Sequence, residues 1–494
     1  MIRKLRLPLV LATLGASVLL PATSHPVFAA TYTVTTTADS GPGSLRQAIT
    51  DVNTAGQYSS SANTIDFSIG GATCSSPAPV YTIQPASALP AIQANLTLID
   101  GYSQCGAEAN SNALSAGSNA QIKIQLDGAL AGANANGLMV GHNSTVRGLS
   151  ITRFAGYGLE NSPTGYYNSF GFSANATFDG NFLGLTPDGV AAGNGAGIGL
   201  SYYQYSRVLV GTPSGASYQP ASANVISGNT TDGIDANGYL DTISGNYIGT
   251  NPTGTAARAN GGSGVSMVPG TSSVNTGATL DNNVISGNTG DGVTVGQFTD
   301  CNICLPPSGA ILSNLIGTNA MGTGAMPNGG NGVTVQVSAH ASIGGSAQGN
   351  IIAYNTGQGI QIGSGAGDPA KSKISANSIF QNAGLGISLA GQVPSACTTG
   401  PTAGAPNGYT PCPVLASGGN SSVTGTACTG CTVEVFIATN PLTETDDQNH
   451  GEGQTYLGSV TAGACSSAPC SGTSAFTLSG SCTGSVCTYP SGAT

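Results

Sequence analysis

Tyrosine side chains gather in one part of this sequence, and they offer its clearest candidate for ligand binding. Seven of the 17 tyrosines fall between Tyr157 and Tyr218. The tightest groupings are Tyr166, Tyr167, Tyr202, Tyr203 and Tyr205, followed by Arg207. A tyrosine combines an apolar ring face with a hydroxyl that can meet sugar hydroxyls. These residues therefore predict a glycan platform; the alternative is that long loops use the rings to pack onto the body of the protein.

Carboxylates that could cleave a polysaccharide form a second candidate set. Glycoside hydrolysis usually needs two carboxylates across the scissile bond. Within the regular part of the chain the candidates are Asp179, Asp188, Asp232, Asp235, Asp241, Asp281, Asp291 and Asp300. Asp232 and Asp291 each precede a glycine, where aspartate commonly serves a turn. Convergence of Arg207 with Asp179 or Asp188 in one groove would favour an enzyme.

Other catalytic patterns are missing from the sequence. It contains no Gly-rich phosphate loop, no nucleophile elbow and no pair of histidines at metal-ligand spacing. His142 and His340 are isolated, and we expect both on the surface or in loops. The acidic segment 444–452 lacks the alternating ligands of a calcium loop. No cofactor is therefore expected, and weak calcium binding at this segment is the alternative.

The cysteines indicate an oxidising compartment. Their number is even, as expected for disulfide bonds in an exported protein. They are Cys74, Cys105, Cys301, Cys304, Cys397, Cys412, Cys428, Cys431, Cys465, Cys470, Cys482 and Cys487. Two local pairs are plausible, Cys74 with Cys105 and Cys301 with Cys304, and the sequence leaves the remaining connectivity open.

The first 29 residues have the order of a secretory signal peptide. A basic start is followed by an apolar run and then by small residues that end at Ala29 and Ala30. Removing this leader takes away three of the 11 basic residues and none of the 21 acidic ones. Such an acidic chain is a poor partner for nucleic acid. No later segment is apolar enough to insert into a membrane, so we expect an exported protein that is periplasmic, extracellular or on the cell surface.

The elements that must position these residues come from a repeated phrase. Six times the chain reads Asn, three residues, Gly, then apolar–any–apolar. The pairs are Asn229 and Gly233, Asn260 and Gly264, Asn288 and Gly292, Asn328 and Gly332, Asn355 and Gly359, and Asn382 and Gly386. The last three positions predict a short strand whose two apolar residues share one face. A strand this short cannot bury its apolar face alone, so the repeats predict a stacked solenoid.

Each repeat contains two further short apolar pieces, which indicates three strands per coil. One of them follows another recurrent Asn, as at Asn224, Asn246 and Asn283. We expect the asparagine side chains to stack and bond along the solenoid axis, because this satisfies turn backbone groups. Similar Gly-rich loops begin at Gly184, Gly249 and Gly317, after every second coil.

The repeat resembles the right-handed parallel β-helix of secreted bacterial repeat proteins in the pectate-lyase-like superfamily. Residues 39–49 resemble the opening motif of many such proteins, with Gly43 and Gln47 in place of the usual Cys and Glu. Residues 98–104 resemble an early coil of the family. The resemblance implies an all-β solenoid of a kind that hosts many enzymes acting on acidic polysaccharides.

This interpretation divides the chain into five parts. The signal peptide occupies residues 1–29, and a strand with an amphipathic helix forms an N-terminal cap at 30–62. Parallel β-helix follows at 63–392, and a Pro/Cys/Gly-rich linker at 393–419. Residues 420–494 alternate like an immunoglobulin-like β-sandwich, which would be truncated.

The outward positions of the repeated phrase decide between the functional alternatives. They read Asp235, Ser266, Thr294, Thr334, Gln361 and Ser388, so no acid recurs along the coils. We therefore predict a non-catalytic protein for adhesion or glycan binding, with polysaccharide or a cell-surface glycan as its partner. The alternative is a polysaccharide lyase or glycoside hydrolase that acts on an acidic polysaccharide.

Overall fold

The structure is a computed structural model of the 494-residue chain. It describes residues 29–56, 62–71, 74–141, 143–161, 175–200, 207–213, 215–238, 241–267, 277–296, 308–336, 339–363, 372–389, 413–419, 422–438, 452–463, 473–483 and 486–488. The predicted signal peptide, apart from Ala29, and the predicted linker up to residue 412 lie outside these residues.

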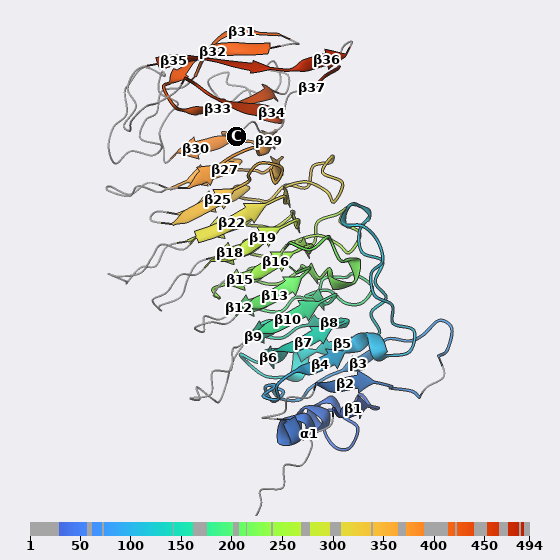
Figure 1. The fold of residues 1–494 in the computed structure, drawn as a ribbon. Coiled ribbons are helices and arrows are strands. Elements are labelled where there is room, and N and C mark those ends of the chain that lie inside the picture. Colours follow the sequence, from blue (N-terminus) through green and yellow to red (C-terminus); the bar gives the residue numbers. More distant parts are fainter. Residues whose placement is uncertain are drawn as a thin grey trace, which may run out of the picture.

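Three long parallel sheets form the body of the molecule, as Figure 1 shows. Sheet A contains β1 (Thr31–Val34), β2 (Asn63–Phe67), β4 (Thr97–Asp100), β7 (Ser144–Arg147), β10 (Ala176–Asp179), β13 (Val208–Gly211), β16 (Thr242–Ser244), β19 (Thr279–Asp281), β22 (Ser308–Leu312), β25 (His340–Ile343) and β28 (Lys373–Ile374). Sheet B contains β3 (Tyr81–Ile83), β5 (Ile124–Asp127), β8 (Leu149–Thr152), β11 (Phe182–Leu183), β14 (Val225–Ile226), β17 (Tyr247–Ile248), β20 (Val284–Ile285), β23 (Leu315–Ile316), β26 (Ile351–Ala353) and β29 (Ser378–Phe380).

Sheet C holds the repeated phrase. Its strands are β6 (Leu138–Val140), β9 (Tyr157–Asn161), β12 (Ala196–Leu200), β15 (Ile234–Ala236), β18 (Val265–Met267), β21 (Val293–Val295), β24 (Val333–Val335), β27 (Ile360–Ile362) and β30 (Ile387–Leu389). From β4 onward the chain visits sheets A, B and C in turn and then returns to A one coil further on. The fold is therefore the predicted parallel β-helix with three strands per coil.

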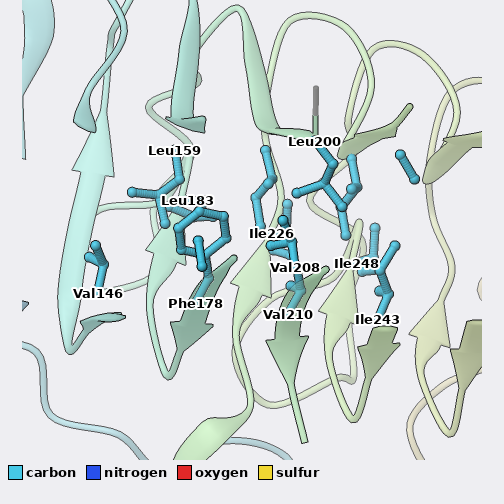
Figure 2. Packing of buried hydrophobic residues seen from close by; sticks show 14 of the residues in the cluster. Val146, Leu159, Phe178, Leu183, Leu200, Val208, Val210, Ile226, Ile243 and Ile248 are labelled. Atoms are coloured by element: carbon cyan, nitrogen blue, oxygen red, sulfur yellow. The ribbon is translucent and has the colours of Figure 1, made fainter. Parts of the chain in front are cut away.

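Inward side chains from the three sheets fill the coil in layers (Figure 2). Val146, Phe178 and Ile243 point inward from sheet A, Leu183 and Ile226 from sheet B, and Leu159 and Leu200 from sheet C, all almost completely buried. Each such side chain contributes about 1.5–3 kcal/mol when it leaves water. The stacking of many coils thus supplies the core that no single coil could form.

Two asparagine ladders run along the solenoid and confirm the predicted stacking. The first contains Asn181, Asn224, Asn246, Asn283, Asn314, Asn350 and Asn377, and the second contains Asn194, Asn229, Asn260, Asn288, Asn328, Asn355 and Asn382. In both ladders each side-chain amide donates to the side-chain oxygen of the next asparagine at 2.8–3.2 Å. The amide also donates to a strand carbonyl, for example from Asn283 to Ile243 at 2.8 Å. These side chains satisfy backbone groups that the turns would otherwise bury unpaired.

Helix α1 (Leu45–Gly56) closes the N-terminal end. Its apolar face consists of Leu45, Ala48, Ile49 and Val52, which are buried in the same core as the first coils. The Ser44 hydroxyl accepts a hydrogen bond from the backbone N–H of Gln47 at 3.2 Å and caps the first turn. The helix thus covers apolar coil that would otherwise face water, as the sequence predicted.

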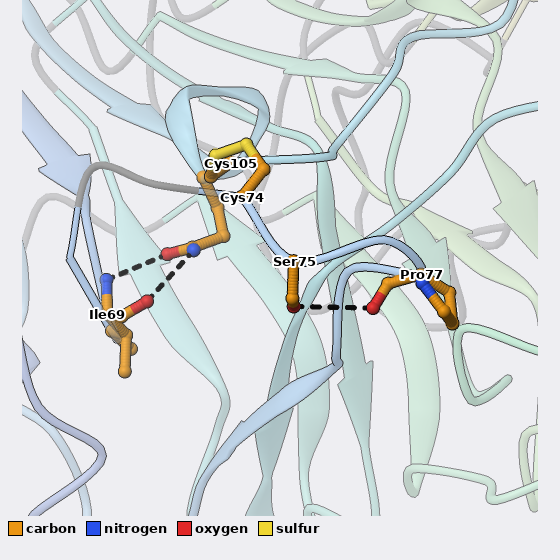
Figure 3. The surroundings of a disulfide bond; sticks show 6 residues. Ile69, Cys74, Ser75, Pro77 and Cys105 are labelled. Carbon is orange, nitrogen blue, oxygen red and sulfur yellow. Dashed lines mark hydrogen bonds between the residues drawn. A yellow bond between two sulfur atoms is a disulfide. The ribbon is translucent and has the colours of Figure 1, made fainter.

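A disulfide bond joins the predicted pair Cys74 and Cys105 beside the first coils (Figure 3). Next to it, the Gln104 side chain both accepts from the backbone N–H of Ile69 at 2.9 Å and donates to its carbonyl at 3.1 Å. A second disulfide joins Cys428 and Cys431. The predicted pair Cys301 and Cys304 lies outside the described residues.

Residues 104–122, which we call the strap, pack on the outer face of sheet B. Leu114, Ala120 and Ile122 of the strap pack against a row of outward apolar residues that includes Phe182, Val225 and Tyr247. The Tyr247 hydroxyl donates to the carbonyl of Leu114 at 2.7 Å. The described connections contain four short 3-10 helices, of which η2 lies in the strap: η1 (Gly101–Ser103), η2 (Leu114–Ala116), η3 (Gly128–Leu130) and η4 (Pro220–Ser222).

The Gly-rich loops that recur every second coil stack over the same face. Equivalent antiparallel bridges close them, between Leu185 and Ala191, Thr250 and Ala257, and Thr318 and Ala325. The backbone N–H of Ala320 donates to Gly254 of the preceding loop at 2.9 Å, and that of Ser118 in the strap donates to Pro252 at 2.8 Å. The loops and the strap therefore form one cover over sheet B.

Small antiparallel sheets lie at the C-terminal end of the solenoid (Figure 1). One contains β31 (Val414–Gly418), β32 (Ser422–Cys428) and β35 (Thr473–Ser479), and a second contains β33 (Thr432–Ala438) and β34 (Gly453–Thr461); β36 (Ser481–Thr483) pairs with β37 (Val486–Thr488). Val423, Val433 and Phe476 share a buried cluster between the first two sheets. This arrangement agrees with the expected small β-sandwich.

Two glutamates connect this region to the ends of the asparagine ladders. Glu434 accepts hydrogen bonds from the Ser375 hydroxyl and, at 2.9 Å, from the backbone N–H of Ala376, next to the final asparagine of the first ladder. Glu452 accepts from the backbone N–H of Asn382, the final asparagine of the second ladder, at 3.3 Å. Within this ladder the backbone N–H of Asn355 donates to Asn382 Oδ1, so Glu452 takes the place that the side-chain oxygen of a further asparagine would have.

Candidate functional site

The outward residues of sheet C form one straight row. Strand pairing aligns Met139, Glu160, Gly199, Asp235, Ser266, Thr294, Thr334, Gln361 and Ser388. The acidic members of the row, Glu160 and Asp235, are two strands apart, with Gly199 between them. From Ser266 onward the row is neutral, so charge is concentrated in the early coils.

Tyr157 lies across the gap that Gly199 leaves in this row. A Cβ atom at position 199 would come within 2.9 Å of three Tyr157 ring carbons, so the ring rests on the glycine backbone. The Tyr157 hydroxyl donates to Asp235 Oδ2 at 2.9 Å. The backbone N–H of Tyr157 is held by Asn136 Oδ1 at 2.8 Å. Asp235 thus fixes the hydroxyl end of the side chain, and Asn136 fixes the backbone from which it starts. The residue is only half-buried on the outer face.

Carboxylates surround the Tyr157 ring. Burial raises the pKa of Asp235 to about 6; the hydrogen bond from Tyr157 opposes this rise, and the negative charge of Asp232 adds to it. Burial also raises the pKa of the Tyr157 hydroxyl, and the charges of Asp235, Glu160 and Asp232 act in the same direction. Perturbed ionisable groups gathered on one open face are typical of functional sites.

Asp232 has a structural role as well as a charge. Its Oδ1 accepts from the backbone N–H of Ser263 in the next coil at 2.5 Å. Asp291 accepts in the same way from Asn331 at 2.7 Å. These two aspartates therefore join neighbouring coils, and their predicted turn role stays a prediction.

A second polar cluster lies on sheet A, where strand pairing aligns Asp66, Asp100, Arg147 and Asp179. Arg147 donates to Asp100 through Nε at 2.9 Å and through Nη2 at 2.6 Å. Asp179, on the other side of Arg147, has a buried Oδ1 without a hydrogen-bond partner. Burial raises the pKa of Asp179 to about 7, although the charge of Arg147 acts against this rise.

The arginine that meets Asp179 is thus Arg147 and not the predicted Arg207. Arg207 is exposed, and its backbone N–H donates to Asn175 Oδ1 at 2.8 Å. It precedes Val208, which pairs with Ala176 at the opposite end of strand β10 from Asp179. At about 3.3 Å per residue, the three residues from Ala176 to Asp179 span roughly 10 Å along the strand. Arg207 therefore lies at least this far from Asp179 along the strand direction.

The other candidates are scattered over the molecule. Asp188 is exposed in a loop, where it pairs with the hydroxyl of Thr186. Asp241 is buried and accepts from the backbone N–H of Val208 at 2.9 Å. Asp281 ends strand β19, and His340 begins β25. Tyr166, Tyr167, Tyr202, Tyr203, Tyr205, His142, Asp300 and most of the acidic segment 444–452 lie outside the described residues.

Sequence reasoning counted Tyr157 among the clustered tyrosines but missed its pairing with Asp235, 78 residues away. The available signal was a glycine at an outward strand position. Gly199 is the counterpart of Asp235, and a glycine inside a strand often marks the close approach of another group. Here that group is an aromatic ring from the preceding coil.

Within the described parts of the chain, no three or more His, Cys, Asp or Glu side chains are arranged to hold a metal ion. The same residues contain no helix long and apolar enough to cross a membrane.

Comparison with known proteins adds a distant structural likeness. No protein-family model matches the chain, and neither does any curated protein sequence. Among solved structures, the chain is similar to the A-module of the mannuronan C-5 epimerase AlgE6 from Azotobacter vinelandii. The match has 15% sequence identity and a TM-score of 0.42, and it covers 72% of this chain and 89% of that one. The strand pairing described above therefore defines the fold on its own.

Proposed function

We propose that this chain is an exported glycan-binding protein and that its binding face is the outer surface of sheet C around Tyr157. The observation that carries the proposal is the fixed, half-exposed Tyr157 ring, resting on Gly199 and bonded to Asp235. A sugar ring stacks on such a platform through its apolar face, while neighbouring carboxylates accept hydrogen bonds from its hydroxyls. Because the ring is already ordered, little conformational entropy is lost on binding.

The surrounding sequence supports this placement. The tyrosine-rich segments 162–174 and 201–206 directly follow strands β9 and β12, which carry Tyr157 and Gly199. The leader-like N-terminus and the two disulfides support export to an oxidising compartment. The strap and the stacked loops cover the outer face of sheet B, whereas Glu160 and Asp235 on sheet C are partly exposed.

Binding to immobilised polysaccharides tests the proposal. The mature chain and its Tyr157→Ala variant are passed over a panel of neutral, basic and acidic polysaccharides, with Tyr456→Ala in the C-terminal region as the matched control. We expect at least one polysaccharide to be retained, and its affinity to fall about tenfold or more in Tyr157→Ala but not in Tyr456→Ala. The proposal is wrong if no polysaccharide binds, or if Tyr157→Ala binds as the parent does.

The sheet A cluster supports a second candidate, a polysaccharide lyase or glycoside hydrolase. Asp179 combines a pKa near neutrality with an adjacent arginine, which are properties of a general base beside a group that binds a carboxylate. Incubation with acidic polysaccharides would then yield new reducing ends or unsaturated products, and Asp179→Asn would abolish them. Retention of a polysaccharide without products argues for binding alone.

A further inference from the structure

The charges around Tyr157 restrict the kind of glycan that fits there. The ion pairs found among the described residues are Arg46 with Asp39, Arg147 with Asp100, and Arg153 with Asp127. None of them involves Asp232 or Asp235. Every charge that acts on the Tyr157 hydroxyl is a carboxylate. Asp232 and Asp235 therefore carry negative charge that no ion pair among the described residues neutralises.

We propose that the Tyr157 platform, which consists of the Tyr157 ring and the carboxylates of Asp232 and Asp235, selects a glycan of amino sugars. The sugars are bound in the ammonium form. This inference rests on the proposed glycan-binding function and names its ligand class.

An ammonium group satisfies both halves of the site. A cation placed over the face of a tyrosine ring is attracted by the ring quadrupole, by about 0.5–2 kcal/mol. The same cation can donate hydrogen bonds to Asp235, whose Oδ2 already accepts from the ring hydroxyl at 2.9 Å. A neutral sugar would gain the stacking and hydrogen bonds from its hydroxyls but no attraction between opposite charges, and a uronate would be repelled by Asp232 and Asp235.

The neighbouring coil adds no titrating group. Strand β18 places Ser266 beside Asp235, and Ser263 of the preceding turn binds Asp232. Among the described residues, the titratable groups that act on Asp235 are Tyr157 and Asp232, and Glu160 acts on the Tyr157 hydroxyl. Since the hydroxyl of Tyr157 stays protonated at neutral pH, the charge of the platform is set by its carboxylates.

Titration calorimetry with three matched oligosaccharides tests the inference. The probes are a β-1,4-linked glucosamine tetramer, its fully N-acetylated counterpart and a galacturonate tetramer, at pH 6.5 and low salt. Of the three probes, only the glucosamine tetramer carries amines that can be protonated. The mature chain is compared with Asp235→Asn, which keeps the shape of the side chain, and with Asp188→Asn, which removes an equal charge from an exposed loop.

We expect the glucosamine tetramer to bind at least tenfold more tightly than the N-acetylated one, and the galacturonate tetramer to bind most weakly. Asp235→Asn should remove most of this preference, and Asp188→Asn should leave it unchanged. Added salt or a fall to pH 4.5, which protonates Asp235, should also reduce it.

The two proposals fail in different ways. If a neutral or acidic probe binds as tightly as the cationic one and still depends on Tyr157, the platform binds glycans and the amino-sugar inference is overturned. If no probe or polysaccharide binding depends on Tyr157, the proposed function falls and the inference falls with it.

Discussion

Sheets B and C are built on the same core but differ completely on their outer faces. Inside, Ile226 and Ile248 of sheet B and Ile234 and Val265 of sheet C are equally buried. Outside, sheet B presents apolar residues beneath the strap and the stacked loops. Sheet C presents a polar row that begins with Glu160 and Asp235 and continues as neutral side chains.

This difference shows how a solenoid separates stability from recognition. Inward residues must stay apolar in every coil, because each coil completes the core of its neighbours. Outward residues are free to differ between sheets, so one face can be closed by packing while another presents a site. The predictions below test whether sheet B serves stability and the early coils of sheet C serve binding.

The largest effect is expected at the cover of sheet B. Tyr247→Ala removes a fully buried ring and its hydrogen bond to Leu114, and should lower the free energy of unfolding by about 3–5 kcal/mol. Tyr247→Phe keeps the ring and should cost about 1 kcal/mol. Denaturant unfolding measures the stability of both variants. Neither variant should change the glycan affinity under conditions in which it is folded. Equal stability of Tyr247→Ala and the parent would mean that the cover is not a stabilising element.

On sheet C, the buried carboxylate should cost stability at neutral pH. The folded-state pKa of Asp235, about 6, lies above its ordinary value of 3.8, so the folded state favours the protonated acid. The stabilisation of the folded state that comes from the protonated Asp235 carboxyl is fully present below pH 3.8. It is lost as the pH rises through about 6. Asp235→Asn should therefore be more stable than the parent by about 1–2 kcal/mol at pH 7.5, after allowance for solvent screening, and equal to it at pH 3.5.

Denaturant midpoints measured across this pH range check the sign of the effect. A constant difference between Asp235→Asn and the parent at all pH values would show that the Asp235 carboxylate does not titrate with folding.

A third, smaller effect, on glycan affinity, is expected at Gly199 beneath the Tyr157 ring. Gly199→Ala places a methyl group against the ring, which must lift from the sheet, and glycan affinity should fall about tenfold, or about 1.4 kcal/mol. The neighbouring Gly197→Ala instead meets the carbonyl of Gly233 at 2.4 Å and should lower stability. Affinity and unfolding measurements on both variants separate the two roles. If Gly197→Ala lowered the affinity and Gly199→Ala lowered only the stability, the glycan would not bind at the Tyr157 ring.

The smallest effect is expected in the later coils of sheet C. Gln361→Glu adds a carboxylate of the same shape to the neutral part of the row, between Thr334 and Ser388. Stability should change by less than about 0.5 kcal/mol, because the position is a surface one without a special role. Glycan affinity should also stay unchanged. A clear gain in binding of the glucosamine tetramer would show that charge alone, without the ring, defines the site.

The period of the sequence predicted much of the fold. The recurrent asparagines and apolar pairs define the three sheets, the ladders and the inward positions, because each signal repeats from coil to coil. The strap was not predicted, since it occurs once and packs on coils up to 133 residues away in the sequence. Its only trace is the apolar outer row at Phe182, Val225 and Tyr247.

The candidate site was predicted only in part, for a similar reason. A single sequence shows that Asp235 faces outward, but not that Tyr157 reaches it across an intervening strand. Arg207 was chosen for its proximity in sequence to Asp179, whereas the strand register places Arg147 there. Contacts between coils depend on loop lengths, and these vary too much here to be read from spacing.

The closed ends of the solenoid carry a consequence for assembly. An open parallel sheet is a template on which another chain can continue the hydrogen bonding, so uncapped coils can join head to tail into filaments. Helix α1 occupies one end, and Glu434 and Glu452 occupy the donors at the other. A carboxylate cannot donate the hydrogen bond that a further asparagine rung would require. Removal of helix α1 together with the C-terminal sheets that carry the two glutamates would therefore expose both ends and allow copies of the solenoid to join head to tail.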